Sequence, residues 1–245
     1  MLKRSDDAES DRMMRVILAE GTTGAGRAWT RRIELDKRKQ VEALGSRPSD
    51  PNPLPSTRYN TEAEALIGCA TPPRGGALLF ALVRAVRPLH AIEIGTAHGY
   101  GGLYIGAGLR ENGRGTLCSL EGMRVRVDLG RQAIRRFGLE EYVSVVEGDF
   151  RTTVPETLAR MRPVDLIFSD GNKDPSMTGD QFWMGLAGME QGGYMLFDDI
   201  GFSAEISALW REFVENERVR WAITVQRRWG LLRIAPAGPE WRPRP

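Results

Sequence analysis

The sequence is poor in the residues that most often carry metal or nucleophilic chemistry, with only two cysteines and two histidines among 245 residues. Both cysteines, Cys69 and Cys118, lie in apolar segments, which is typical of buried free thiols in a reducing compartment. The histidines and cysteines stand in unlike settings and lack the spacing of a zinc site. No G-x-S-x-G motif is present, so nothing supports a serine nucleophile on a strand–helix elbow.

The chain also lacks a strong excess of charge and a long apolar run. Its 34 basic residues nearly balance its 32 acidic residues, which argues against a dedicated nucleic-acid binder. The basic cluster RRW at 227–229 is interpreted as a solvated turn. No run approaches the roughly 20 apolar residues of a membrane span, and the first ten residues contain no apolar stretch of signal-peptide length. We therefore expect a cytoplasmic protein without nucleic-acid or membrane partners.

The sequence does contain a regular alternation of apolar runs and helical patterns. The apolar runs predict five strands and a closing hairpin, at residues 89–95, 115–121, 142–149, 164–170, 192–199, 220–226 and 230–236. Helices are expected between them, and the one over 123–138 has Gly138 as its stop. This order predicts an α/β fold, a doubly wound and mostly parallel sheet with right-handed crossovers and an antiparallel C-terminal hairpin.

Three segments differ in composition. Residues 1–60 are expected to form a helical extension followed by a linker at 46–60, whose prolines do not fit a helix interior. Residues 61–236 carry the alternating pattern and are expected to form one domain, and the Arg/Pro-rich tail at 237–245 is predicted to be irregular. The extension's helix at 31–44 is predicted to pack across the domain or onto a second subunit through a weak apolar stripe of Ile33, Leu35, Val41 and Leu44.

Acidic residues gather at the carboxyl ends of the predicted strands. Five consecutive strands end in acid, and these side chains lie at or just past the ends: Glu93, Glu121, Asp149, Asp170, Asp198 and Asp199. Ligands bind outside the carboxyl ends of strands in sheets of this kind. Acids without a role in a site would be scattered over loops, so we predict that this set binds ligands.

The stretch AIEIGTAHGYGG at 91–102 forms a glycine-rich turn after the first strand. A dinucleotide fold needs G-x-G-x-x-G, whereas here Gly95 and Gly99 are separated by three residues and Glu93 precedes the turn. A carboxylate disfavours a bound phosphate and suits a cationic ligand. Glu121, at the end of the second strand, can accept from ribose hydroxyls. A cationic nucleoside without phosphate is S-adenosylmethionine, although the glycines alone would also fit a simple corner.

The chain resembles a known family from about Thr71 to Pro236, the class I S-adenosylmethionine-dependent O-methyltransferases of the metal-dependent catechol and caffeoyl-CoA type. The similar stretches are AIEIGTAHGYGG, SLEGM, VVEGDF, DLIFSDGNKD and GGYMLFDD. The resemblance implies a seven-stranded sheet, a dimer and a cofactor-binding set of Glu93, Gly95, Gly99, Tyr100, Glu121, Met123, Asp149 and Asp170. In this set Glu121 would bind the ribose, and Asp149 would lie near the adenine amino group. Met123 would pack on the adenine ring or belong to the core.

Asp170, Asp198 and Asp199 form a second predicted group. Three carboxylates from two strand ends would repel one another unless a cation joined them or protons were retained, and the sequence shows no nearby cluster of basic residues. Oxygen ligands suit Mg²⁺ or Ca²⁺. In the resembled family the ligands are two Asp and one Asn, so Asp199 replaces the amide. We predict a divalent metal at these residues, with Mg²⁺ favoured over Ca²⁺.

Lys173 follows Asp170 by three residues, which matches the D-x-x-K pattern of the family's catalytic lysine. Near a dication and a sulfonium its ammonium form is disfavoured, so it could take a proton from an acceptor hydroxyl. The alternative is a loop lysine paired with Asp174. The family usually has a tyrosine where this chain has Ser176, which affects the expected acceptor contacts. Besides Lys173 and Asp170, the catalytic candidates include His98, which lies inside the glycine turn and has a structural role as its alternative.

These observations predict methyl transfer from S-adenosylmethionine to a hydroxyl of a small aromatic or natural-product acceptor, assisted by a divalent metal. Three other classes stay open at this point. They are a metal-independent methyltransferase of the same fold, a nicotinamide oxidoreductase, and a non-catalytic binding or assembly protein whose N-terminal helices form an interface. The oxidoreductase is disfavoured because its phosphate-binding glycines are absent.

Overall fold

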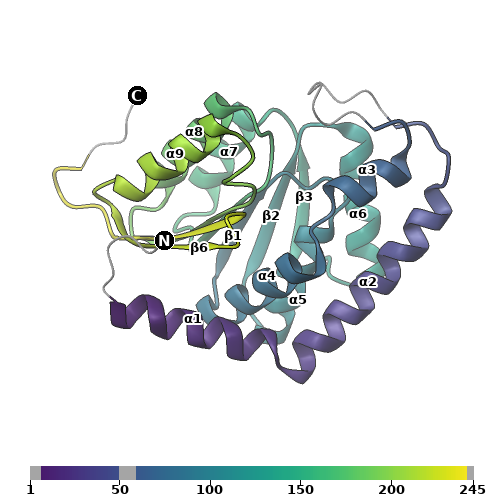
Figure 1. Ribbon diagram of the computed structural model, residues 1–245, viewed down its shortest axis with the longest axis horizontal. Coiled ribbons are helices and arrows are strands. Elements are labelled where there is room, and N and C mark those ends of the chain that lie inside the picture. Colours follow the sequence, from purple (N-terminus) through teal and green to yellow (C-terminus); the bar gives the residue numbers. More distant parts are fainter. Residues whose placement is uncertain (1–6, 50–58, 242–245) are drawn as a thin grey trace.

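A seven-stranded sheet forms the centre of the computed structural model, which describes residues 7–49 and 59–241. The strand order is β3-β2-β1-β4-β5-β7-β6 (Figure 1). β1 to β5 are parallel, and β7 is antiparallel to both β5 and β6. The bounds are β1 His90–Ile94, β2 Thr116–Glu121, β3 Val143–Glu147, β4 Leu166–Ser169, β5 Gly193–Phe197, β6 Val219–Val225 and β7 Trp229–Ile234. The predicted fold class is confirmed.

Helices cover both faces of this sheet, which explains why its strands read as continuous apolar runs. One face packs against α1, α2, α4, α5 and α6, and the other against α7, α8 and α9 (Figure 1). The helices of the alternating region are α3 Glu62–Cys69, α4 Pro73–Val86, α5 Tyr100–Asn112, α6 Arg124–Phe137, α7 Phe150–Arg160, α8 Pro175–Gly188 and α9 Ala204–Glu215. Within the described residues, no single helix is long and apolar enough to cross a membrane, and only the bent pair α3 and α4 meets that test when taken together.

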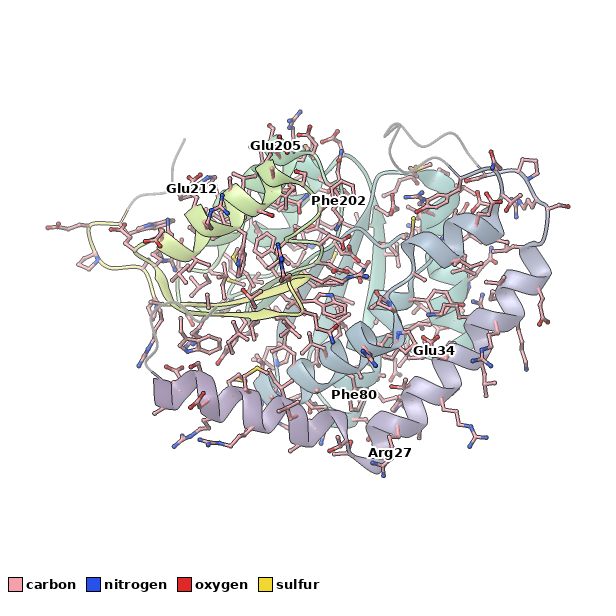
Figure 2. The ribbon with its side chains drawn as sticks, viewed as in Figure 1. Arg27, Glu34, Phe80, Phe202, Glu205 and Glu212 are labelled. Atoms are coloured by element: carbon pink, nitrogen blue, oxygen red, sulfur yellow. The ribbon has the colours of Figure 1, made fainter. Side chains whose placement is uncertain are left out.

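The N-terminal helices α1 Asp7–Gly21 and α2 Gly24–Leu44 lie along the domain (Figure 1). Ile33 of α2 is fully buried, in agreement with the predicted packing across the domain, but Leu35 is 48% exposed and does not belong to the buried stripe. Two hydroxyls of α5 donate to α2, from Tyr100 to Asp36 and from Tyr104 to Glu34, each over 2.9 Å. Figure 2 shows Glu34 on the side of α2 that faces the domain.

The predicted linker and tail are described only in part. Residues 50–58 of the linker and 242–245 of the tail lie outside the described residues. Pro48 and Thr61 form an antiparallel bridge, so the two ends of the linker lie side by side. Residues 237–241, the described part of the tail, contain no helix or strand.

The strand order changes direction between β1 and β4. The chain runs outward from β1 through β2 to β3 and then returns to place β4 on the other side of β1. A crevice opens outside the carboxyl ends of strands at such a switch point. The fold therefore places the ends of β1 and β4 at the position where a ligand is expected.

Candidate active site

A small pocket lies at the carboxyl ends of β1 and β4. Five predicted site residues line it: Glu93, Gly95, His98, Tyr100 and Asp170. The opposite wall comes from residues 69–71, between α3 and α4. The sequence did not predict that this connection would face the glycine turn.

Two glycines of the turn are required for different reasons. Gly95 has a φ of +99°, and a Cβ there would lie 2.6 Å from the carbonyl oxygen of Asp170. Gly101, in the first turn of α5, has an ordinary φ, but a Cβ there would overlap the carboxylate of Glu93. The turn thus lets the β4 backbone and a buried acid approach closely.

Glu93 is 1% exposed. Its Oε2 accepts a hydrogen bond of 2.5 Å from the Ser119 hydroxyl, and that hydroxyl also pairs with Thr96. Burial raises the pKa of Glu93 to about 8, although the Ser119 hydrogen bond opposes the rise. The structure therefore keeps a carboxyl group in the pocket wall that is easily protonated near neutral pH.

Glu93→Gln is expected to remove part of the pH dependence of stability. The pKa of Glu93 rises from 4.5 to about 8 on folding, so its contribution to stability is complete below pH 4.5 and is lost as the pH rises to about 8. At about 1.4 kcal/mol per unit, the upper limit is roughly 5 kcal/mol. Urea unfolding between pH 5 and pH 9 should show a flatter profile for the variant than for the wild type. The exposed Glu147, changed to Gln, is the control, and equal slopes for wild type and Glu93→Gln would contradict the assignment.

Glu121, Met123 and Asp149 lie at the ends of the next two strands. Glu121 accepts from the backbone N–H of Ala97 at 2.9 Å and of Met123 at 3.0 Å, one bond on each oxygen. These bonds leave lone pairs for further donors. Met123 is half-buried before α6, and the exposed Asp149 caps α7 by accepting from the Arg151 N–H. Glu121 therefore joins the turns after β1 and β2 in a position to meet a ligand.

The three predicted metal ligands do converge. Oxygen atoms of Asp170, Asp198 and Asp199 all lie within 4.8 Å of one another. Two cations accompany them, Lys173 and Arg228, although the sequence showed no nearby cluster of basic residues. Lys173 Nζ lies 2.8 Å from Asp170 Oδ1 and 3.6 Å from Asp199 Oδ2. Arg228 donates to both oxygens of Asp198, over 2.7 and 2.9 Å, so the interpretation of 227–229 as a solvated turn is wrong for this residue.

Lys173 pairs with the cluster and not with Asp174, which caps α8 by accepting from the Met177 N–H. Burial would lower the pKa of Lys173, but the three carboxylates together raise it above its usual value. Burial also raises the pKa of Asp170, against the effect of Lys173. In the ligand-free site the lysine is therefore a stable ammonium. The predicted shift in the other direction concerns a site with bound cations and stays a prediction.

His98 forms a buried pair with Glu62 of α3. Its Nε2 lies 3.3 Å from Glu62 Oε2, and both residues are 3% exposed. Burial lowers the pKa of His98, with partial opposition from Glu62, and its Nδ1 has no hydrogen-bond partner among the described residues. A neutral imidazole with one unsatisfied nitrogen can bond a ligand in the pocket. No signal in the sequence pointed to Glu62, which lies 36 residues before His98.

Comparisons with known proteins agree with this geometry. Residues 92–200 match a family model described as a methyltransferase domain. The chain is 29% identical over 140 residues to a catechol O-methyltransferase of Mycobacterium tuberculosis and 27% identical over 129 residues to a caffeoyl-CoA O-methyltransferase of Stellaria longipes. These alignments cover 57% and 51% of the chain, and 61% and 53% of the relatives, so the chain spans less than two thirds of either relative's length.

The solved structures show the same fold. An O-methyltransferase from Bacillus cereus in complex with S-adenosylhomocysteine has a TM-score of 0.59 and 21% identity, over 82% of this chain and 99% of that one. At this identity the likeness shows the fold alone. Together the matches confirm the resemblance to class I O-methyltransferases of the catechol and caffeoyl-CoA type.

Proposed function

We propose, on the premise that residues 92–200 form a methyltransferase domain, that the chain is an S-adenosylmethionine-dependent O-methyltransferase. The acceptor in this proposal is a small aromatic or natural-product molecule with a hydroxyl group. The observation that supports it most strongly is the pocket, because a glycine turn, buried acids and Lys173 meet at one switch point.

The residues present fit the cofactor. The pocket wall offers carboxylates to a cationic ligand, and no arginine or lysine lies in the turn itself to hold a pyrophosphate. Glu121 has lone pairs free for ribose hydroxyls, and His98 has an unsatisfied Nδ1 in the wall. Gly95, Gly99 and Tyr100 shape the turn. Met123 and Asp149 lie further along, where the adenine would be.

The chemistry divides between the cofactor and the chain. When bound, S-adenosylmethionine supplies a methyl group already activated by the positive sulfur. The chain orients the acceptor and removes the hydroxyl proton, which we assign to Lys173. A lysine must be neutral to accept that proton, and a nearby sulfonium favours the neutral form. Because the carboxylates raise the pKa of Lys173, turnover should rise as the pH becomes alkaline.

The divalent metal and the dimer predicted from the sequence stay predictions. The cluster as it stands does not fit a dication, because two cations, Lys173 and Arg228, already pair with its carboxylates. No step of the proposal therefore passes through a metal.

The test is calorimetric titration of S-adenosylhomocysteine into the purified protein, with NAD as the control ligand. We expect micromolar binding of S-adenosylhomocysteine, about −8 kcal/mol, and none of NAD. Glu121→Ala should weaken the binding of S-adenosylhomocysteine, because the backbone N–H groups of the two turns lose their common acceptor. If neither ligand binds, the proposal fails and a non-catalytic protein with this fold becomes the better reading.

A further inference from the structure

Arg228 pairs with the acidic cluster in the position that a metal ion would take. Its Nε and one terminal nitrogen donate in parallel to the two oxygens of Asp198, and its Nε is 3.4 Å from Asp199 Oδ1. The Asp198 side chain is only 1% exposed. Two parallel bonds from a guanidinium to a buried carboxylate form the strongest ion-pair geometry that proteins use.

The backbone around Arg228 holds this position. The Arg228 N–H donates to Val225 over 3.0 Å, and its carbonyl accepts from Ile200, next to the two acids, over 2.9 Å. The guanidinium carbon lies 5.0 Å from the ring centre of Trp229, which is buried. The hairpin turn is thus attached to the loop after β5 through both its main chain and its side chain.

Backbone φ angles are positive on both sides of the ion pair between Arg228 and Asp198. Asp199 on the loop after β5 has a φ of +59°, and Gln226 and Arg227 in the hairpin turn have φ of +53° and +55°. Residues other than glycine avoid this region unless the surrounding structure imposes it. Positive φ at Gln226 and Arg227 is the conformation that a tight hairpin turn requires at its two central residues, and the Arg228 N–H closes this turn on Val225.

The net charge of the cluster also disfavours a dication. With every group ionised, three carboxylates and the two cations Lys173 and Arg228 leave one net negative charge. A single sulfonium charge would balance it, whereas a dication would leave an excess of positive charge beside two fixed cations. Asp170 lines the pocket as well as the cluster, so the cluster adjoins the proposed cofactor site.

We propose that Arg228 takes the place of a divalent cation at Asp170, Asp198 and Asp199, and that its guanidinium positions the acceptor oxygen. Two of its five N–H groups serve Asp198, and the side chain is 41% exposed, so other donors can reach an acceptor oxygen. The second part rests on the proposed methyltransferase function. The first part concerns cation binding alone and can be tested without cofactor, acceptor or turnover.

The experiment titrates Mn²⁺ and Mg²⁺ into the wild type and four variants, by calorimetry and by the effect of each ion on thermal unfolding. The wild type should show no saturable binding. Arg228→Ala should bind one ion, with affinity for Mn²⁺ raised about 100-fold or more because a neighbouring like charge is removed. Added Mn²⁺ should then raise the midpoint of thermal unfolding of the variant alone. Arg227→Ala, at an exposed position of the same turn, is the matched control and should behave as the wild type.

Arg228→Gln covers the case in which the alanine variant does not fold, since it keeps part of the alkyl chain and an N–H donor but has no charge. Either neutral variant that binds one ion, while the wild type and Arg227→Ala bind none, supports the proposal. Saturable binding of one Mn²⁺ by the wild type, abolished by Asp198→Asn, would overturn it. Failure of both neutral variants to bind would also overturn it, because Arg228 would then not be what keeps the ion out. The S-adenosylhomocysteine titration decides the methyltransferase function separately.

Discussion

Lys173→Ala is expected to lower turnover by about two to four orders of magnitude, which is the usual contribution of a positioned acid or base. Nζ of Lys173 is directed into the carboxylate cluster beside the pocket, 2.8 Å from Asp170 Oδ1. Among the described residues, no other lysine or histidine forms an ion pair or hydrogen bond with that cluster. The affinity for S-adenosylhomocysteine should change little, because the ribose and turn contacts are assigned to other residues. Single-turnover rates and calorimetry, measured on the same preparation, separate the two effects.

Lys173→Arg distinguishes proton removal from charge alone. Arginine keeps the positive charge beside Asp170 but stays protonated at every accessible pH. If Lys173 removes the proton, the arginine variant should fold, bind S-adenosylhomocysteine and remain inactive, and the alkaline rise in turnover should disappear. Near-normal turnover in Lys173→Arg would show that the site needs only a cation at this position. Lys39→Ala, at an exposed position of α2, is the control for the loss of a lysine.

Gly95→Ala is expected to cost several kcal/mol of unfolding free energy, roughly 2–6, from a strained backbone and an overfilled contact. The φ of Gly95 is +99°, and the new Cβ would lie 2.6 Å from the Asp170 carbonyl oxygen and 2.7 Å from the Gly171 Cα. These are backbone atoms, so relief requires the end of β4 to move. Asp170 would move with it, and binding of S-adenosylhomocysteine should be lost. Urea unfolding and calorimetry measure the two effects.

Gly113→Ala provides the control for this substitution. Gly113 also has a positive φ, +65°, at the end of α5, but a Cβ there meets nothing within 4 Å. The Gly113→Ala variant should lose only about 1 kcal/mol of unfolding free energy, from the positive φ alone, and should bind S-adenosylhomocysteine as the wild type does. Equal losses of stability in the two variants would show that backbone conformation alone, and not the close approach of β1 and β4, makes Gly95 necessary.

The sequence predicted the fold well because local patterns determined most of it. The central strands β1, β4 and β5 are buried on both faces, so their residues form short apolar runs, and the glycine or acid after each run marks where it stops. The same rule predicts that Glu93, Glu121 and Asp170 lie at the carboxyl edge of the sheet. Convergence of Asp170, Asp198 and Asp199 followed from the adjacency of β4 and β5.

What the sequence could not predict depends on contacts between distant segments. Arg228 lies 30 residues from its partner Asp198, and an arginine in a hairpin turn is usually solvated. Only the antiparallel placement of β7 beside β5 brings it to the cluster. Glu62 meets His98 because the chain before α4 returns over the glycine turn. The raised pKa of Lys173 in the ligand-free site also depends on distances between charges that the sequence does not give.

The hydrogen bonds from Tyr100 and Tyr104 to α2 bear on how this protein can be recombined with its relatives. Asp36 and Glu34 accept from phenols that belong to the helix after the glycine turn, and the neighbouring Ile33 is fully buried. The boundary at residue 60 follows the sequence pattern, and the residues before it share buried contacts with α5. A chimera that took its first 60 residues from another protein would leave two buried phenols without acceptors unless it carried both acids along. Exchange of N-terminal segments should succeed only when these acids and tyrosines are inherited together.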